Sequence, residues 1–197
     1  TLRYRIGVAT YSVGVAYNNR KTSLQFIQQE MNNITALSNE TCQLGIQSRN
    51  MVLYIAKKDS PQPIRLMSSV GKQLPLYCTG LGRALLAYKS EEEIRNLFPE
   101  VLTAYTPHTI ATINDLLKEL ELTRQRGYAV EHEETNLMVN CIAVSLDYNN
   151  APIAALSISI PTFRISESKE KEAVQILWEA KQRIETHFKM YGVDFGN

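Results

Sequence analysis

Two serines, Ser157 and Ser159, share one face of a predicted strand in the stretch AALSISIPT. Successive side chains of a strand point to opposite faces, so Leu156, Ile158 and Ile160 share the other face. A strand face in water usually carries charged residues, and this one carries none. The hydroxyls can therefore line a pocket and donate to a carboxylate or a sugar-like ligand. The alternative is that they pair with hydroxyls across strands on an exposed face.

A glycine-bearing turn, TGLGR at residues 79–83, leads into a predicted helix. The first backbone N–H groups of a helix have no partner within it, and the helix dipole adds positive potential there. The amides of Gly80 and Leu81 therefore suit a carboxylate or a phosphate. The alternative is a tight turn whose glycines only allow close packing.

A third polar cluster, EHEE at residues 131–134, follows a predicted strand. Such a run of charged residues is usually a solvated turn. The functional alternative is that one carboxylate turns inward and accepts hydrogen bonds from ligand hydroxyls. His132 has no evident partner in the sequence, so we expect no catalytic role for it.

Three cysteines, Cys42, Cys78 and Cys141, lie far apart in apolar surroundings, without a C-x-x-C pair or a metal-ligand spacing with the three histidines. We expect reduced, cytoplasmic thiols that pack as small hydrophobes, and neither a metal nor another cofactor. A nucleophilic cysteine would need a neighbouring base or a helix N-terminus to lower its pKa. The G-x-S-x-G, P-loop and H-E-x-x-H motifs are absent, so no catalytic residue is predicted.

The overall composition indicates one folded domain with no unusual surface. The 197 residues are 44% hydrophobic and 21% charged, with a net charge of +1. Nothing in these totals favours a nucleic-acid or membrane surface, and the longest apolar runs are too short to span a membrane. A DNA-binding role would have to lie in another part of a longer protein.

Hydrophobic periodicity predicts helices on either side of two groups of strands. Helical spacing is found over 22–39, 79–88, 90–98, 112–126 and from 166 onward, and residues 3–17 are typical of a strand leading into a helix. Alternation predicts strands over 42–46, 51–58, 64–69, 128–134, 141–148 and 152–160, with a turn over 71–75. Strands joined by hairpins indicate an α+β domain with a largely antiparallel sheet flanked by helices.

Three separated stretches together resemble one protein family. LPLYCTGLGRALLAY is similar to the "hAtalGKallA" segment of IclR-type transcriptional regulators, and RGYAVEHEE to their "GyavddEE". NCIAVSLDYNNAPIAALSISIPTFRIS is similar to "rCIAaPvfd…vvaAlSiSgPt.R.s". The order and spacing also agree, and the similarity extends over essentially the whole chain.

The resemblance implies a GAF-like, C-terminal effector-binding domain of a bacterial regulator. Residues 1–21 would then be the end of the DNA-binding wing and the linker helix, and residues 22–197 the effector-binding domain. The N-terminal winged helix-turn-helix would lie outside this chain. Such domains associate into dimers and tetramers, and a bound small molecule shifts the affinity for operator DNA.

The resemblance also implies a ligand pocket. Its residues would be Gly80, Leu81, Glu131, Cys141, Ser157 and Ser159, with apolar walls from Leu66, Met67 and Leu74. The Gly80 and Leu81 amides would face an anionic head group, to which both serine hydroxyls would donate. Cys141 would pack the pocket wall.

The sequence departs from the family pattern near this pocket. Glu131 replaces the usual Asp, His132 the next acidic residue, and Met138-Val139-Asn140 the usual Gly-x-Arg. An acidic residue beside an anion is repulsive unless it meets hydroxyls, so Glu131 favours a polyhydroxy acid such as an aldonate or a keto-deoxy sugar acid. The ALSISIPTFRIS stretch is also most similar to the sugar-acid-sensing branch of the family.

Two other functions stay open at the level of sequence. One is an enzyme on a GAF-like fold that uses Cys141 or Cys78 in redox or hydrolytic chemistry, which would need a thiolate partner or a resolving thiol. The other is an oligomerisation domain with a vestigial pocket. A non-enzymatic ligand sensor is the interpretation that the motifs favour.

Overall fold

The chain folds around one sheet in the computed structural model, which describes residues 7–19, 22–63 and 69–193. The strand predicted from residue 3 lies largely outside these ranges, as do Leu66, Met67 and nearly all of the strand predicted over 64–69. What the structure says of the site therefore concerns the other predicted residues.

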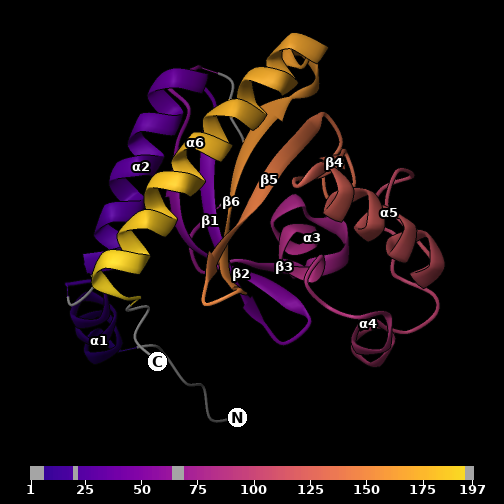
Figure 1. Cartoon of the computed structure of the whole chain (residues 1–197), viewed down its shortest axis with the longest axis horizontal. Coiled ribbons are helices and arrows are strands. Elements are labelled where there is room, and N and C mark those ends of the chain that lie inside the picture. Colours follow the sequence, from indigo (N-terminus) through magenta and orange to yellow (C-terminus); the bar gives the residue numbers. More distant parts are fainter. Residues whose placement is uncertain (1–6, 20–21, 64–68, 194–197) are drawn as a thin grey trace.

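The described sheet has six strands in the order β3-β2-β1-β6-β5-β4, and each neighbouring pair is antiparallel (Figure 1). The strands are β1 (Thr41–Ser48), β2 (Met51–Lys58), β3 (Gln73–Pro75), β4 (Ala129–His132), β5 (Val139–Tyr148) and β6 (Ala151–Pro161). The sheet thereby confirms the predicted α+β class.

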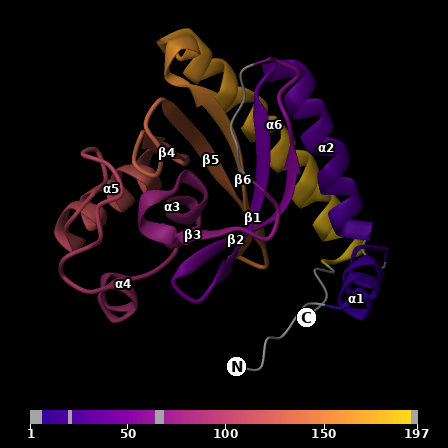
Figure 2. The same cartoon turned by 180° about the vertical axis from the view of Figure 1, so that it is seen from behind.

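Helices cover both faces of the sheet (Figures 1 and 2). The long helices α2 (Thr22–Ser38) and α6 (Glu167–Tyr191) lie side by side on one face, and α1 (Val8–Asn19) precedes them. The short helix α3 (Gly80–Leu86) packs on the other face, and α4 (Glu91–Leu97) and α5 (Ile113–Arg126) lie on that side too. Two single turns complete the elements, η1 (Leu76–Cys78) and η2 (Thr162–Arg164).

Each sheet face has its own hydrophobic core. Leu156, Ile158 and Ile160 of β6 are buried with residues of α2 and α6, as the alternation predicts. Ala155, from the opposite face of β6, packs with the cluster around α3 and α5. The serines of β6 therefore face the side of α3.

Local sequence signals account for several element ends. Ser90 and Glu93 form a capping box at the start of α4, Thr112 caps α5, and Gly127 ends α5 with φ of 79°. The predicted turn over 71–75 was wrong in part, because Gln73–Pro75 pairs with β2. A three-residue edge strand is too short for alternation to reveal it.

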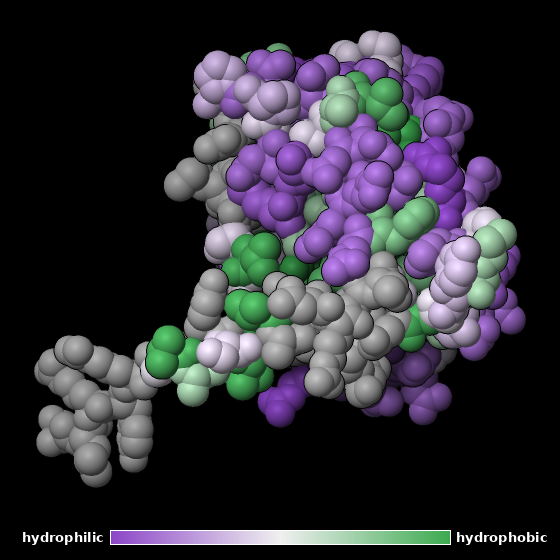
Figure 3. Space-filling view, turned by 90° about the vertical axis from the view of Figure 1, so that its left-hand side faces the viewer, coloured by the Kyte–Doolittle hydropathy of each residue, from purple (hydrophilic) through white to green (hydrophobic). Residues whose placement is uncertain are grey.

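The described residues contain no helix long and apolar enough to cross a membrane. In the view of Figure 3, hydrophilic residues cover most of the upper surface, and hydrophobic residues form one group at the lower left and a smaller group near the top. Helix α1 exposes apolar side chains to solvent at Val8, Val13 and Val15. Such patches are typical of surfaces that meet another chain or domain.

Candidate functional site

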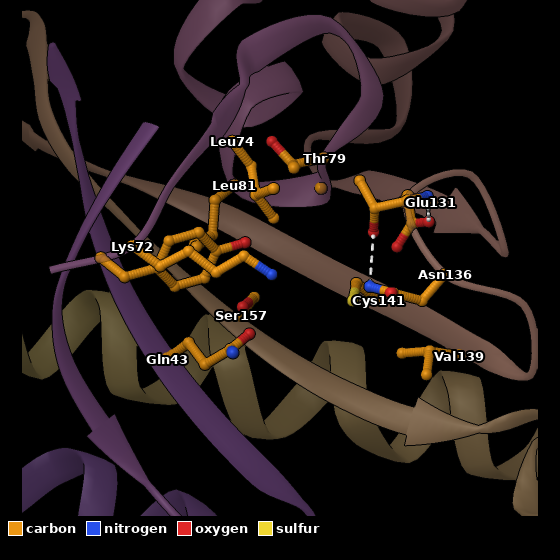
Figure 4. Close-up of a pocket in the computed structure, with 13 residues that line it drawn as sticks. Gln43, Lys72, Leu74, Thr79, Leu81, Glu131, Asn136, Val139, Cys141 and Ser157 are labelled. Carbon is orange, nitrogen blue, oxygen red and sulfur yellow. Dashed lines mark hydrogen bonds between the residues drawn. The ribbon is translucent and has the colours of Figure 1, made fainter. Parts of the chain in front are cut away.

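A pocket lies on the sheet face that carries α3, and side chains from across the whole sheet line it (Figure 4). In sheet order these are Lys72 directly before β3, Tyr54 of β2, Gln43 of β1, Ser157 of β6, Cys141 of β5 and Glu131 of β4. The remaining lining residues are Leu74, Thr79, Gly80, Leu81, Thr135, Asn136 and Val139. The structure thus brings together six of the nine residues expected at a ligand site. Leu66 and Met67 lie outside the described residues, and Ser159 lies behind the lining.

Strand register explains why distant residues meet here. Glu131 pairs with Cys141, and Cys141 pairs with Ser159. In the next row, Gln43 pairs with Ser157. Directly opposite residues of antiparallel strands point to the same face, so both rows project towards α3.

The two serines have different roles. The Ser159 hydroxyl donates to Gln43 Oε1 over 3.0 Å and lies 3.1 Å from Cys141 Sγ. Ser159 therefore braces two lining residues without lining the pocket itself. The Ser157 hydroxyl is buried and has no hydrogen-bond partner among the described residues. Of the two serines, Ser157 is the one whose hydroxyl is free to meet a ligand in the pocket.

The Glu131 carboxylate turns into the domain and is 1% exposed. Its Oε1 accepts hydrogen bonds from the backbone N–H of Glu134 over 2.5 Å and of Thr135 over 3.2 Å. Burial raises the pKa of the Glu131 carboxyl, although these two N–H groups oppose the shift. The solvated-turn alternative is therefore wrong for Glu131, whereas His132 is exposed and its Nδ1 lies 3.0 Å from Asn140 Oδ1.

The raised pKa of Glu131 predicts a pH-dependent cost to stability. Glu131→Gln keeps an oxygen for the two N–H groups but cannot ionise. Because an acid with a raised folded-state pKa binds its proton more tightly when folded, wild-type stability falls as pH rises above about 4.5. We expect the variant to gain stability relative to wild type between pH 4.5 and 8, measured by urea unfolding.

The exposed Glu167 provides the control for this titration. Glu167→Gln should give a nearly constant difference from wild type over the same pH range. A constant difference for Glu131→Gln as well would contradict the assigned cause.

A buried ion pair holds the segment that carries Glu131 against helix α3. Arg83 of α3 is 2% exposed and pairs with the buried Glu134. Its Nε donates to the Tyr77 carbonyl over 3.0 Å, and its Nη1 to the Val130 carbonyl over 2.7 Å. Arg83 thereby ties α3 to Val130, which precedes Glu131, and to Glu134, whose N–H donates to the Glu131 carboxylate.

Gly80 and Gly82 both lie in the first turn of α3, and close packing explains one of them. Thr79 caps the helix by accepting from the Gly82 N–H over 3.1 Å. A Cβ on Gly82 would lie 2.1 Å from the Leu76 carbonyl oxygen, so the close-packing alternative is right for Gly82. Gly80 and Leu81 do line the pocket.

The cysteines are not poised as nucleophiles. Burial raises the pKa of Cys141 well above its ordinary value, and the neighbouring Glu131 adds to the shift. Burial raises the pKa of Cys78 to about 12. Both effects disfavour the reactive thiolate. The described residues also contain no group of histidine, cysteine or carboxylate side chains that could hold a metal ion.

The pocket is narrow in this structure. Its enclosed cavity of about 20 Å³ has room for a single water molecule, within a wider space of about 430 Å³ that includes open solvent. A ligand of several carbon atoms therefore requires side chains to move aside. Lys72 and Asn136 are exposed lining residues and can do so without opening the core.

Sequence reasoning missed several lining residues. Gln43 carried a signal in the sequence, because it is a polar residue between the apolar positions Cys42 and Leu44 of β1. In the structure its side chain is 2% exposed. Tyr54 and Lys72 are adjacent to the pocket only through the pairing of β2 with the turn before β3, which no local pattern reveals. The other missed lining residues lie at or beside the ends of α3, β4 and β5. They are Thr79, Thr135, Asn136 and Val139.

A small pocket between an antiparallel sheet and a short helix, lined by apolar side chains and a few convergent polar groups, is the kind of site in which proteins bind small molecules. The family of bacterial transcriptional regulator IclR C-terminal domains matches residues 16–186. The chain belongs to this family, and the resemblance seen in the three sequence motifs is confirmed.

Among individual proteins, the chain is 34% identical over 184 residues to the HTH-type transcriptional regulator KdgR of Dickeya chrysanthemi, covering 92% of this chain and 60% of that protein. It is 31% identical to the HTH-type transcriptional repressor AllR of Escherichia coli, covering 93% of this chain and 68% of that protein. The chain thus spans roughly two thirds of these regulators.

Solved structures agree with the fold. The C-terminal domain of E. coli KdgR superposes with a TM-score of 0.75 at 32% identity, covering 83% of this chain and 96% of that one. Thermotoga maritima IclR gives a TM-score of 0.84 at 30% identity, covering 94% of this chain and 76% of that one.

Proposed function

We propose that this domain binds a small polyhydroxy carboxylate, such as a sugar acid, in the pocket across its sheet. The observation that carries this proposal is the Ser157 hydroxyl, which is buried in the pocket wall and has no hydrogen-bond partner in the described part of the chain. A buried polar group without a hydrogen bond costs about 1–3 kcal/mol. A polar ligand atom beside Ser157 removes that cost.

Glu131 supports the polyhydroxy character of the ligand. When ionised it is an acceptor only, so it repels a bare carboxylate but accepts hydrogen bonds from hydroxyl groups. One oxygen of Glu131 is already held by two backbone N–H groups, which fixes the direction of the carboxylate. The backbone N–H groups of Gly80 and Leu81, together with Ser157, would serve the acidic end of the ligand.

The role of the whole protein belongs to the same proposal. The relatives KdgR and AllR carry names that state a helix-turn-helix type of regulator, and this chain spans only part of them. We propose that residues 1–21 link the domain to such a DNA-binding segment and that the protein is a cytoplasmic repressor. Ligand binding then alters operator affinity because it favours one quaternary arrangement.

Self-association as a dimer or tetramer is part of this proposal. The exposed valines of α1 support it, as does an apolar groove between α2 and α6 that contains the exposed Met190 and Tyr191. An enzymatic function based on Cys141 or Cys78 is not favoured, because burial raises the pKa of both thiols.

Calorimetric titration of the domain with sugar acids tests the binding function. A panel of D-gluconate, D-galactonate, 2-keto-D-gluconate and D-glucuronate should contain a ligand. For that ligand, Ser157→Ala should weaken binding about tenfold through the lost hydrogen bond. Glu131→Ala should weaken it by about tenfold or more, because charged acceptors contribute more than neutral ones.

Ser157→Ala has a second readout that separates ligand contact from damage to the fold. Removing a buried hydroxyl without a partner should leave the free domain as stable as wild type, or more so. Ser168→Ala, on the exposed start of α6, is the control and should alter neither property. Unchanged affinity in both pocket variants, or no binding by any acid of the panel, would refute the proposed function.

A further inference from the structure

Lys72 is a basic side chain of the pocket that no motif pointed to. It lines the pocket, and its ammonium group points into the space between Leu81 and Ser157 (Figure 4). It forms no ion pair with any residue that the structure describes. An exposed lysine that turns towards a pocket and lacks a counter-charge is available to an anionic ligand.

The backbone of Lys72 is held in register with the pocket. The Lys72 carbonyl accepts from the Tyr54 N–H over 3.0 Å, and the preceding Gly71 N–H donates to the Tyr54 carbonyl over 2.8 Å. Gly71 has a φ of 86°, a conformation that glycine adopts without strain. Because Tyr54 itself lines the pocket, this turn fixes the position of Lys72 relative to the site.

Charge is therefore distributed unevenly along the pocket. Lys72 lies at the end of the pocket near β3, and Glu131 lies at the end near β4 (Figure 4). The uncharged polar groups of Gln43 and Ser157 lie on the strands between them. A carboxylate is attracted to the first end and repelled from the second, whereas hydroxyl groups suit the second.

We propose that Lys72 is the counter-ion of the effector carboxylate, so that the ligand lies across the strands with its acidic end towards β3 and its hydroxyl groups towards Glu131. This inference rests on the proposed function and adds both an orientation and a specificity determinant to it. Because Lys72 and Glu131 line opposite ends of one pocket, this orientation favours a chain of several carbons over a two-carbon acid.

The test pairs a lysine variant with an uncharged version of the ligand. The sugar acid that binds best in the panel above and its own amide, for example D-gluconate and D-gluconamide, are titrated into wild type and into Lys72→Met. Wild type should prefer the acid. Lys72→Met should lose about tenfold in affinity for the acid and little for the amide, because only the acid makes a charge-assisted hydrogen bond.

Two further variants control this experiment. Lys72→Arg retains the charge and should bind the acid within about twofold of wild type, with the same preference over the amide. Lys58→Met removes an exposed positive charge at the end of β2, outside the pocket, and should bind as wild type does. The ionic-strength dependence of acid binding should also fall in Lys72→Met alone.

The outcomes separate the two proposals. An equal loss of acid and amide affinity in Lys72→Met, or no loss of either, would overturn the role of Lys72 while leaving the binding function intact. A loss of the same size in Lys58→Met would assign the effect to net charge and would also overturn it. Failure of wild type to bind any acid of the panel would overturn both proposals.

Discussion

Replacing Arg83 by methionine should lower the free energy of unfolding by about 3–5 kcal/mol, the usual cost of removing one partner of a buried ion pair. The substitution leaves the buried Glu134 carboxylate without its positive partner. Its remaining contact among the described residues is a long 3.3 Å hydrogen bond from the Ile110 N–H. The substitution also removes the donors to the carbonyls of Tyr77 and Val130. Urea unfolding monitored by circular dichroism measures the change.

A double-mutant cycle tests whether the unpaired charge of Glu134 causes this loss of stability. Glu134→Gln neutralises the carboxylate, so Arg83→Met should cost much less in that background than in wild type. Lys171→Met, which breaks an exposed ion pair with Glu167, should change stability little. Equal costs of Arg83→Met in both backgrounds would show that packing, and not charge, dominates.

Replacing Gly82 by alanine should also destabilise the domain strongly, by about 3 kcal/mol, the upper end of the usual cost of overpacking. The new Cβ would lie 2.1 Å from the carbonyl oxygen of Leu76 and 2.4 Å from its Cα. These are backbone atoms of η1, so relief requires α3 to move away from the turn before it. Thermal unfolding should show a clear loss in melting temperature.

Gly80→Ala is the matched control, two residues earlier in the same helix. Its Cβ would meet the Cβ atoms of Ala143 and Cys141 at 3.4 Å, which is an ordinary contact distance. Alanine also favours helix over glycine, so stability should be unchanged or slightly higher. A similar loss in both variants would contradict the steric explanation for Gly82.

Local chemistry explains which parts of the fold could be predicted. The Ser90–Glu93 capping box and the Gly127 helix end are contained within a few residues, and so are the alternating strands of the β5–β6 hairpin. The edge strand Gln73–Pro75 forms because β2 presents hydrogen-bonding groups to it. That cause lies about twenty residues away in the sequence.

The same distinction applies to the site. Ser157 and Glu131 could be singled out because each breaks the pattern of its own segment, a small hydroxyl within an apolar strand and a carboxylate at a strand end. The partnership of Arg83 with Glu134 spans 51 residues and depends on the packing of α3 against β4. Buried arginines are rare, and no local pattern in the sequence indicates that Arg83 is one of them.

The alternation of β6 divides two tasks between neighbouring residues. Ala154, Leu156, Ile158 and Ile160 hold the sheet to α2 and α6, whereas the residues between them face the other side. Substitutions that reshape the pocket therefore need not disturb the long-helix core. Ligand preference can diverge during evolution without a new fold, which agrees with relatives that keep this architecture at about a third sequence identity.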